Sequence, residues 1–537
     1  SVQLPLVRSL SLFLSLVLYC VCVCVHVEPV ERTVLVAMLS TRSSSGGREG
    51  WLADYEVGYS ADGTITALKY QFYVDAGIDQ QDTLGSVYMG MNWADNAYFF
   101  PNYAAQAQLS YTNTPARTSM RAPGVVQTCL CTEMVIERVA VECGLDVLSV
   151  QQRNFIQNGE TAICGQVISD STLPTVWNTL LQRARYAQRW SHANEYNAKT
   201  LWRKRGIAIC PVKYGMGWAG YNAGVQLGVN QVDGTVTVHH NGAEIGQGIN
   251  TKAAQAVAYA LGIDIKLIRV GSSDSDRIVN GGPTGGSGTS EVVVKAALNA
   301  CAKLNDRLAP YRKIAASTAA AAGARGGGVT TPSTNTQQWI DLLASVSPDV
   351  SLNTEGWFSP AENPNQQPFQ YFVYAACVTE LELDVLSGEV HVLASEIVYD
   401  CGQSLNPSVD IGQIEGALVM GLGYFLTERV EYDTASGQLL TNGTWEYKPP
   451  LAQDIPGTLN VTLLKNQFNE SGILGSKAVG EPPYVVANSV YFALKMAIAS
   501  ARKDAGVTGH FDLEVPATIE LRQQASLVRP ERFVMPF

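Results

Sequence analysis

The sequence lacks the patterns that define several common classes of protein. Its 11 cysteines form no C-x-x-C pair, which argues against zinc fingers and cysteine-bound iron–sulfur clusters. Only 16% of the 537 residues are charged, and the formal net charge is -11. Because no basic stripe can neutralise phosphates, we expect no nucleic-acid partner. The cysteines lie scattered in apolar contexts, like buried free thiols in a reducing compartment, so we expect a cytoplasmic protein.

Two glycine-rich stretches look like nucleotide-binding motifs, but one lacks the helix and the other the spacing that such motifs need. Residues 215–220 match G-x-G-x-x-G, yet residues 221–229 look extended, so the helix of a dinucleotide fingerprint is missing. Residues 472–477 have too few positions between their glycines for a P-loop. The sequence therefore supports no nucleotide site.

The N-terminus carries an atypical apolar run. Residues 9–25 are uncharged and follow Arg8. They resemble the apolar part of a signal peptide, but no small-residue cleavage site follows, and the run is short for a membrane span. We interpret residues 1–28 as a mis-assembled terminus outside the fold and expect no membrane association. The alternative is a genuine targeting segment, in which case the protein would be secreted or membrane-tethered.

The rest of the chain shows mixed α and β patterns. A chain of this length, with 46% hydrophobic residues, is expected to form two or more domains. Alternating apolar residues predict strands, and 3.6-residue periodicity predicts helices, without a regular βαβ rhythm. The predicted strands are 236–239, 389–392 and 459–463, and the predicted helices are 126–142, 251–261, 291–308 and 488–502. We place domains at 29–165 and 175–537, with a flexible insert at 315–335 that is rich in small residues.

Glu481 is the most informative single residue. It stands between Gly480 and the pair Pro482 and Pro483, in a stretch with few other acids. A carboxylate held rigidly in apolar surroundings has a raised pKa, which suits a general base near neutral pH. The alternative is an ordinary acid in a Pro-Gly turn, and the motif alone does not decide between the two.

Three glycine-rich loops, at residues 121–124, 242–248 and 280–291, stand directly before predicted helices. Backbone N–H groups at such places bind anions. Gln247 and Gln413 add side-chain amides, which both donate and accept and can read the edge of a heterocycle. Ordinary turn chemistry explains any one loop alone. The three loops together with a proline-framed glutamate favour a cofactor site.

In their order and spacing these residues resemble the molybdenum hydroxylases, the family of xanthine dehydrogenases and aldehyde oxidases. The resemblance runs from about residue 30 to the C-terminus. The matching stretches are 118–124, 246–248, 284–290, 403–407, 410–416 and 477–483. It implies an α+β fold, in which two domains bind a molybdenum ion held by a pterin dithiolene (molybdopterin) between them.

The resemblance also implies roles for single residues. Glu481 would be the general base in a reaction that hydroxylates an aldehyde or an N-heterocycle with water-derived oxygen, and Arg121 would lie beside the metal. No side chain of this protein would bind the metal directly. The residues expected to grip the pterin and its phosphate are Gln247, Gly285, Gly286, Ser287, Thr289 and Gln413.

The expected substrate pocket departs from the purine-oxidising members. Those members carry an arginine near the position of Met89, a phenylalanine at Pro123 and a threonine at Ala219. Trp218 would supply one aromatic wall. Losing a charged hydrogen bond to a buried polar substrate costs about 1.5–3 kcal/mol. We therefore expect aldehydes or less polar heterocycles rather than xanthine.

The resemblance further implies partners that this chain does not contain. Family members carry 2Fe-2S and FAD domains, which we expect upstream or on a partner subunit, and they are commonly homodimers. A glycine-rich loop with a substrate-facing glutamate should lie just upstream of about Pro29. We therefore expect this chain alone to be inactive. The alternative from another class is a non-catalytic remnant or scaffold that keeps the fold and binds no cofactor.

Overall fold

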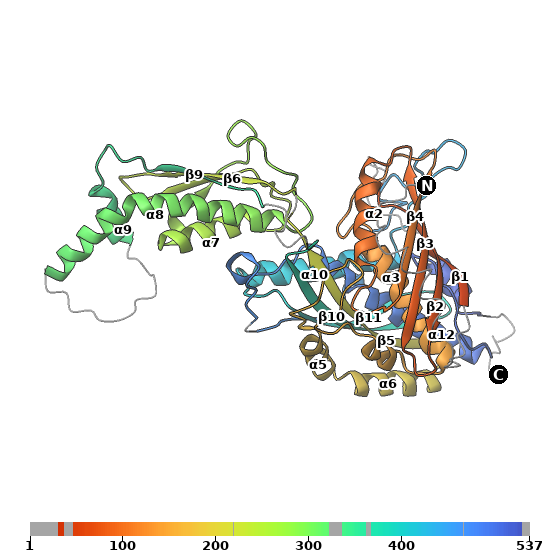
Figure 1. Ribbon diagram of the computed structural model, residues 1–537. Coiled ribbons are helices and arrows are strands. Elements are labelled where there is room, and N and C mark those ends of the chain that lie inside the picture. The colour runs from red at the N-terminus through yellow and green to blue at the C-terminus, as the bar shows by residue number, and fades with distance from the viewer. Residues whose placement is uncertain are drawn as a thin grey trace, which may run out of the picture.

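The structure is a computed structural model that describes residues 30–36, 47–218, 220–321, 336–360, 367–465 and 467–528. The predicted apolar segment 1–28, Ala219 and most of the predicted insert lie outside the described residues. The described part contains three four-stranded sheets with helices packed around them. Figure 1 shows an elongated molecule, with one lobe projecting from a larger body.

The first sheet lies at the N-terminal end of the body. It contains β1 (Val30–Val36), β2 (Trp51–Tyr59), β3 (Ile65–Gly77) and β4 (Tyr103–Tyr111) in that order. The first three strands are antiparallel, and β4 runs parallel to β3. A parallel neighbour needs a crossover, and α2 (Gln81–Trp93) supplies it.

Helix α3 (Val125–Cys143) packs in the core beside this sheet (Figure 1). It begins after Gly124, which has a φ of 70°. It ends at Gly144 in the left-handed conformation, a common glycine C-cap. Most of its side chains are buried on every face, as expected for a central core helix.

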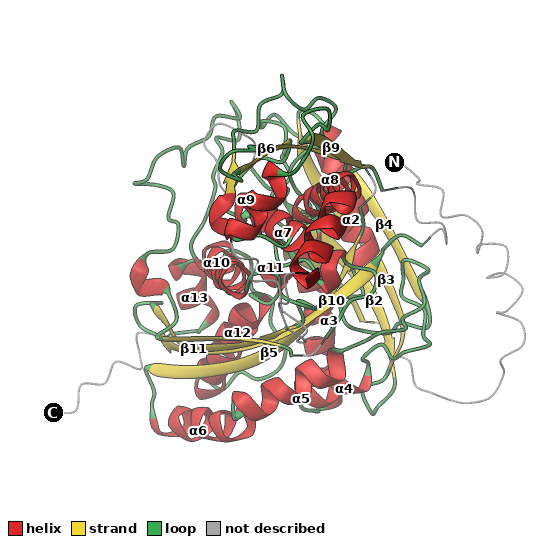
Figure 2. Cartoon of the chain, turned by 90° about the vertical axis from the view of Figure 1, so that its left-hand side faces the viewer, coloured by secondary structure: helices red, strands yellow, loops and turns green. Residues whose placement is uncertain are grey.

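The second sheet forms the centre of the body, in the order β12-β11-β10-β5. Helices cover both of its faces (Figure 2). Gly206 on β5 allows close packing, because a Cβ there would lie 1.8 Å from the Ala493 carbonyl oxygen of α12. These elements are β5 (Arg203–Met216), β10 (Tyr371–Asp384), β11 (Val390–Tyr399), β12 (Thr458–Leu463), α5 (Leu173–Arg183), α6 (Tyr186–Lys199) and α12 (Asn488–Asp504).

The third sheet builds the projecting lobe, in the order β8-β7-β6-β9 (Figure 1). Its strands are β6 (Ala223–Val229), β7 (Val236–His240), β8 (Ile268–Val270) and β9 (Asn353–Phe358). The long helix α8 (Thr289–Ala321) packs against β6 and β9, and α7 (Ile249–Leu261) packs beside α8.

The remaining elements lie between the strands of these sheets or after the last strand. They are α4 (Val147–Arg153), α9 (Thr336–Ala344), α10 (Pro407–Leu426), α11 (Pro482–Val485), α13 (Ile519–Ala525) and the short 3-10 helices Ile265–Leu267, Ala452–Asp454 and Ile473–Gly475. Helix α10 and the stretch Pro482–Asp504 are long and apolar enough to cross a membrane, but both are packed largely inside the protein.

The predicted strands and helices are confirmed, with one difference at α8. We expected that helix to end at residue 308 and a flexible insert to begin at 315. The helix instead continues through Pro310 to Ala321. A proline removes one backbone donor inside a helix, yet this one does not end α8. The start of the predicted insert is therefore helical, residues 322–335 lie outside the described part, and the domain limits 29–165 and 175–537 stay a prediction.

Candidate active site

The loop before α3 contacts the C-terminal loop that carries Glu481. Arg121 Nε donates a hydrogen bond to the Gly480 carbonyl at 2.5 Å. Arg121 Nη2 donates to the Gln413 backbone carbonyl at 2.9 Å. One guanidinium therefore joins two segments that are far from it in sequence, and the predicted residues Arg121 and Gln413 meet beside the loop of Glu481.

The backbone of this loop is fixed by close packing. Gly124 lies so near α2 that a Cβ would be 1.9 Å from the Ser86 carbonyl oxygen, so no larger residue fits. Ala122 has a φ of 57°, which is strained for a residue with a side chain. The fully buried Arg48 donates to the Arg121 carbonyl at 2.8 Å. The structure thus holds Arg121 in place from two sides.

Glu481 is buried at this junction, with 8% of its surface exposed. Its Oε2 accepts a hydrogen bond from Tyr214 Oη at 3.1 Å, and its backbone N–H donates to Ser287 Oγ at 2.6 Å. Burial raises the pKa of the Glu481 carboxyl. The Tyr214 hydrogen bond, then the Ala122 backbone, then the Arg121 charge oppose that rise. The predicted raised pKa therefore has a structural cause.

The glycine-rich loop before α8 approaches Glu481 closely. A Cβ on Gly480 would lie 2.5 Å from Ser287 Oγ, and a Cβ on Gly286 would lie 1.9 Å from Tyr221 Oη. Gly286 and Ser287 both have a positive φ, near 55° and 60°. A side chain at Gly480 or Gly286 would therefore displace Ser287 or Tyr221, and the positive φ of Gly286 also favours glycine there.

Threonine side chains stabilise the loop at 280–291 and connect it to the loop at 242–248. Thr289 Oγ1 accepts a hydrogen bond from the Gly285 N–H at 3.2 Å, which closes the turn into α8. Thr284 Oγ1 accepts from the Ala243 N–H at 2.9 Å. The loops at 242–248 and 280–291 are thus neighbours in space, as expected of two parts of one site.

The two predicted amides behave differently. Gln413 Nε2 donates to the Gly246 carbonyl at 3.0 Å, which connects α10 to the loop at 242–248. Gln247 instead stabilises its own loop, because its amide donates to the Ala243 carbonyl at 2.8 Å and accepts from the Ile245 N–H at 2.7 Å. Gln413 is therefore part of the network around Arg121, and the pterin-binding role of Gln247 stays a prediction.

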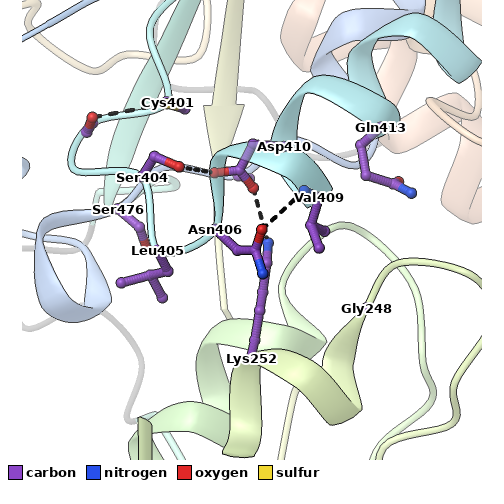
Figure 3. A network of polar contacts seen from close by, with 12 residues as sticks. Gly248, Lys252, Cys401, Ser404, Leu405, Asn406, Val409, Asp410, Gln413 and Ser476 are labelled. Carbon is purple, nitrogen blue, oxygen red and sulfur yellow. Dashed lines mark hydrogen bonds and ion pairs between the residues drawn. The ribbon is translucent and has the colours of Figure 1, made fainter. Parts of the chain in front are cut away.

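The start of α10 is held by polar contacts that the motif alone does not explain (Figure 3). Asn406 caps the helix by accepting the Val409 N–H at 3.1 Å. Asp410 forms a largely buried ion pair with Lys252 of α7 at 3.1 Å. Gln413 follows on the same helix and extends away from this pair (Figure 3). These contacts hold the first turn of α10, the helix that carries Gln413.

Glu291 is a site residue that sequence reasoning missed. Its Oε2 accepts hydrogen bonds from Trp218 Nε1 and Tyr371 Oη, both at 2.8 Å. Tyr371 Oη in turn accepts the Ala478 N–H at 3.1 Å, close to Glu481 in sequence. Burial raises the pKa of Glu291 to about 7. Its only sequence signal was its place at the start of a helix.

The expected pocket residues lie on two sides of the site. Met89 on α2 is half-buried, and Pro123 is buried in the loop before α3. These segments touch, since a Cβ on Gly90 would lie 3.0 Å from the Gly124 carbonyl oxygen. Trp218 lies beside the glycine-rich loop before α8. Ala219 is outside the described residues, and a single pocket lined by all four residues stays a prediction.

Two cavities lie away from Glu481. One of about 580 Å³ is in the projecting lobe, between residues such as His239 and Arg307. The other, of about 400 Å³, lies beside Asp75 and Tyr432. The hydrogen-bonded network of Arg121, Gln413, Ser287 and the Glu481 loop lines neither cavity. Within the described ranges no group of three or more His, Cys, Asp and Glu side chains could hold a metal ion.

The residues present fit a flat, anionic cofactor. Crowded glycines, the Ser287 hydroxyl and the Gln413 amide converge on a buried carboxylate and a guanidinium. Small residues let backbone approach a ligand, and amides and guanidinium groups bind heterocycle edges and phosphate.

Solved structures with the same fold support this reading of the architecture. Quinoline 2-oxidoreductase from Pseudomonas putida 86 aligns with a TM-score of 0.75 and 20% identity, over 90% of this chain and 63% of that chain. The aldehyde oxidoreductase from Desulfovibrio desulfuricans ATCC 27774 aligns with a TM-score of 0.72 and 22% identity, over 89% of this chain and 49% of that one. At these identities the likeness concerns the fold.

Two family models, both described as a molybdopterin cofactor-binding domain, match residues 179–456 and 17–155. The fold and site thus define a molybdopterin-binding protein. The xanthine dehydrogenase of Drosophila subobscura is 36% identical over 484 residues, covering 88% of this chain and 34% of that protein. Xanthine dehydrogenase 1 of Arabidopsis thaliana is 35% identical over 507 residues, covering 92% of this chain and 36% of that protein.

The chain belongs to the molybdenum hydroxylase family, of which it represents the C-terminal, molybdopterin-binding part. This confirms the predicted family, the α+β fold and the molybdenum–pterin cofactor. The chain spans about a third of the length of the two xanthine dehydrogenases.

Proposed function

We propose that this chain is the cofactor-binding part of an oxidoreductase that hydroxylates aldehydes or N-heterocycles with water-derived oxygen, with Glu481 as general base. The observation that carries the proposal is the burial of one carboxylate where the predicted cofactor loops converge. When bound, the molybdenum–pterin group supplies the two-electron redox chemistry, and the protein supplies orientation and electrostatics.

The cofactor would be held by the loop at 280–291, by Gln413 and by the backbone beside Arg121. Gly285, Gly286 and Ser287 bring backbone close to Glu481, and the Arg121 guanidinium fixes the Gly480 carbonyl. This arrangement keeps the carboxylate at a set position and excludes bulk water from it, since only 8% of Glu481 is exposed.

Glu481 would accept the proton released when the oxygen nucleophile forms. A carboxylate with a raised pKa is a stronger base than an exposed one, and burial raises the pKa of Glu481. It must be ionised to accept a proton, so the rate should rise with pH through its pKa. A well-placed general base contributes on the order of 10²–10⁴ in rate.

For the substrate we propose an aldehyde or a weakly polar heterocycle rather than xanthine. The support is chemical: Met89 and Pro123 stand where purine-oxidising members have arginine and phenylalanine. Met89 offers no charged hydrogen bond, and Pro123 offers no ring to stack on a flat purine. The relatives named above are xanthine dehydrogenases, so this preference depends on those two positions.

We further propose that electrons leave through iron–sulfur and flavin modules, supplied on the same polypeptide or by a partner subunit, in a cytoplasmic homodimer. The chain alone should then bind cofactor poorly or turn over slowly with natural acceptors. This proposal rests on the family resemblance and on the length of the relatives.

The test compares kcat/KM for an aromatic aldehyde and for xanthine, using the chain produced in a pterin-making host together with iron–sulfur and flavin modules. We expect molybdenum in the assembly and a kcat/KM ratio that favours the aldehyde. Met89→Arg should shift that ratio toward xanthine. Preference for xanthine in the unmutated assembly would contradict the proposed substrate class, and stoichiometric molybdenum without either activity would contradict the proposed reaction.

A further inference from the structure

Strand β5 places a second ionisable group directly against Glu481. Tyr214 lies near the end of this strand and is buried, and its Oη donates to Glu481 Oε2 at 3.1 Å. The hydrogen bond joins residues 267 positions apart in the sequence. Nothing in the local motif around Glu481 indicates this partner.

The ring of Tyr214 is held independently of its hydroxyl. In the β5–β10 ladder Tyr214 pairs with Val373. Its ring centroid lies 5.6 Å from that of Trp93, which itself packs edge-on against Phe369 at 4.4 Å. Removal of the hydroxyl alone should therefore leave the ring, the strand and the backbone around Glu481 in place.

The direction of the hydrogen bond follows from the charges. Burial raises the pKa of Tyr214 well above its usual value, so the phenol stays protonated and can only donate while Glu481 is ionised. A hydrogen bond to the charged form of an acid favours that form. Tyr214 therefore opposes the rise in the pKa of Glu481 that burial causes.

Other groups also face the carboxylate. Arg121 and Arg48 attract it, and the Ala122 backbone stabilises its charged form. The charge of Glu481 also contributes to a raised pKa of the Tyr221 phenol, after burial. Among the groups that lower the pKa of Glu481, the Tyr214 side chain contributes most. A variant at Tyr214 should therefore show a measurable effect even with both arginines present.

We propose that Tyr214 is a positioning residue for Glu481: its hydroxyl holds Oε2 and keeps the carboxylate in the ionised form that accepts the proton. This inference rests on the proposed function only for the last step, proton transfer. The hydrogen bond and its effect on ionisation belong to the protein itself and are measurable without cofactor.

The test uses Tyr214→Phe, which removes one oxygen atom and keeps the ring. Tyr70→Phe is a matched control, because Tyr70 is equally buried and its Oη bonds to Thr132 Oγ1 at 3.1 Å instead of to Glu481. The readout is the infrared carboxyl band of Glu481, assigned by subtracting the spectrum of Glu481→Gln and followed against pH. Comparable melting temperatures for the two phenylalanine variants verify that both fold.

We expect the midpoint of the Glu481 titration to move up by about one pH unit in Tyr214→Phe, since a hydrogen bond to a charged group is worth about 1.5 kcal/mol or more. It should not move in Tyr70→Phe. An unchanged midpoint in Tyr214→Phe would overturn the inference.

A second readout separates this inference from the proposed function. In the loaded assembly, the acidic limb of the kcat/KM profile should move up with the infrared midpoint. If the infrared midpoint moves and the kinetic limb does not, the role of Tyr214 toward Glu481 is supported, and Glu481 is not the catalytic base.

Discussion

The indole Nε1 of Trp218 donates to Glu291 Oε2 at 2.8 Å, which ties an expected wall of the substrate pocket to the first turn of α8. Tyr371 donates to the same oxygen and accepts the N–H of Ala478. One buried carboxylate thus connects the pocket wall, the central sheet and the loop that leads to Glu481. Its removal should affect all three.

Glu291→Ala should destabilise the protein more than Glu291→Gln. Alanine leaves the buried indole and phenol donors without an acceptor, at about 1–3 kcal/mol for each unsatisfied group. Glutamine keeps one acceptor oxygen. Urea unfolding followed by circular dichroism measures the difference, and equal losses in both variants would show that the two hydrogen bonds do not stabilise the fold.

Glu133 should make stability fall as pH rises toward neutrality. Burial raises its pKa from an ordinary value of 4.5 to about 7, although Tyr98, Gln151 and Asn96 donate to it. Between these values the folded protein holds a proton that the unfolded chain has released. By linkage, the free energy of unfolding therefore decreases with rising pH in this window, by about 3 kcal/mol in total.

Glu133→Gln removes the titrating group and should remove that part of the slope. The measurement is the free energy of unfolding of both proteins at a series of pH values from 4.5 to 8. Parallel profiles for the two proteins would mean that Glu133 does not titrate in this window.

Gly480→Ala should impair cofactor binding. Its Cβ would lie 2.5 Å from Ser287 Oγ and 3.1 Å from Ser287 Cβ, so the Ser287 side chain must move and its hydrogen bond with the Glu481 N–H is disturbed. Gly85→Ala is the control, because a Cβ there meets nothing within 4 Å and the position lies within α2, where alanine is favoured. Molybdenum per chain should fall in the first variant and stay unchanged in the second. Equal loading would show that close loop contact is not required.

Local sequence patterns predicted much of the fold and several residues that the structure places together. Glu481, Arg121, Ser287 and Gln413 form one hydrogen-bonded network, as their shared membership of a motif set suggested. Their catalytic and binding roles stay predictions.

Residues that act through tertiary contacts could not be predicted. From the sequence, Tyr214 is only a strand residue and Glu291 only an acidic residue at the start of a helix. Their partners Glu481 and Trp218 lie 267 and 73 positions away in sequence. Periodicity indicates which face of a helix or strand is buried, but it does not indicate which side chain of another element that face contacts. The extension of α8 past Pro310 to Ala321 was also missed, because a proline is a local signal for the end of a helix.

The most direct measurement of the central claim is the activity of Glu481→Gln at matched molybdenum content. Glutamine keeps the size of the side chain and one acceptor oxygen, and it cannot act as a base at this position. We predict full molybdenum loading and a loss of aldehyde oxidation on the order of 10²–10⁴-fold, with Glu133→Gln retaining most activity as a buried-acid control outside the candidate site. Retention of wild-type kcat in fully loaded Glu481→Gln would contradict the assignment of Glu481 as the catalytic base.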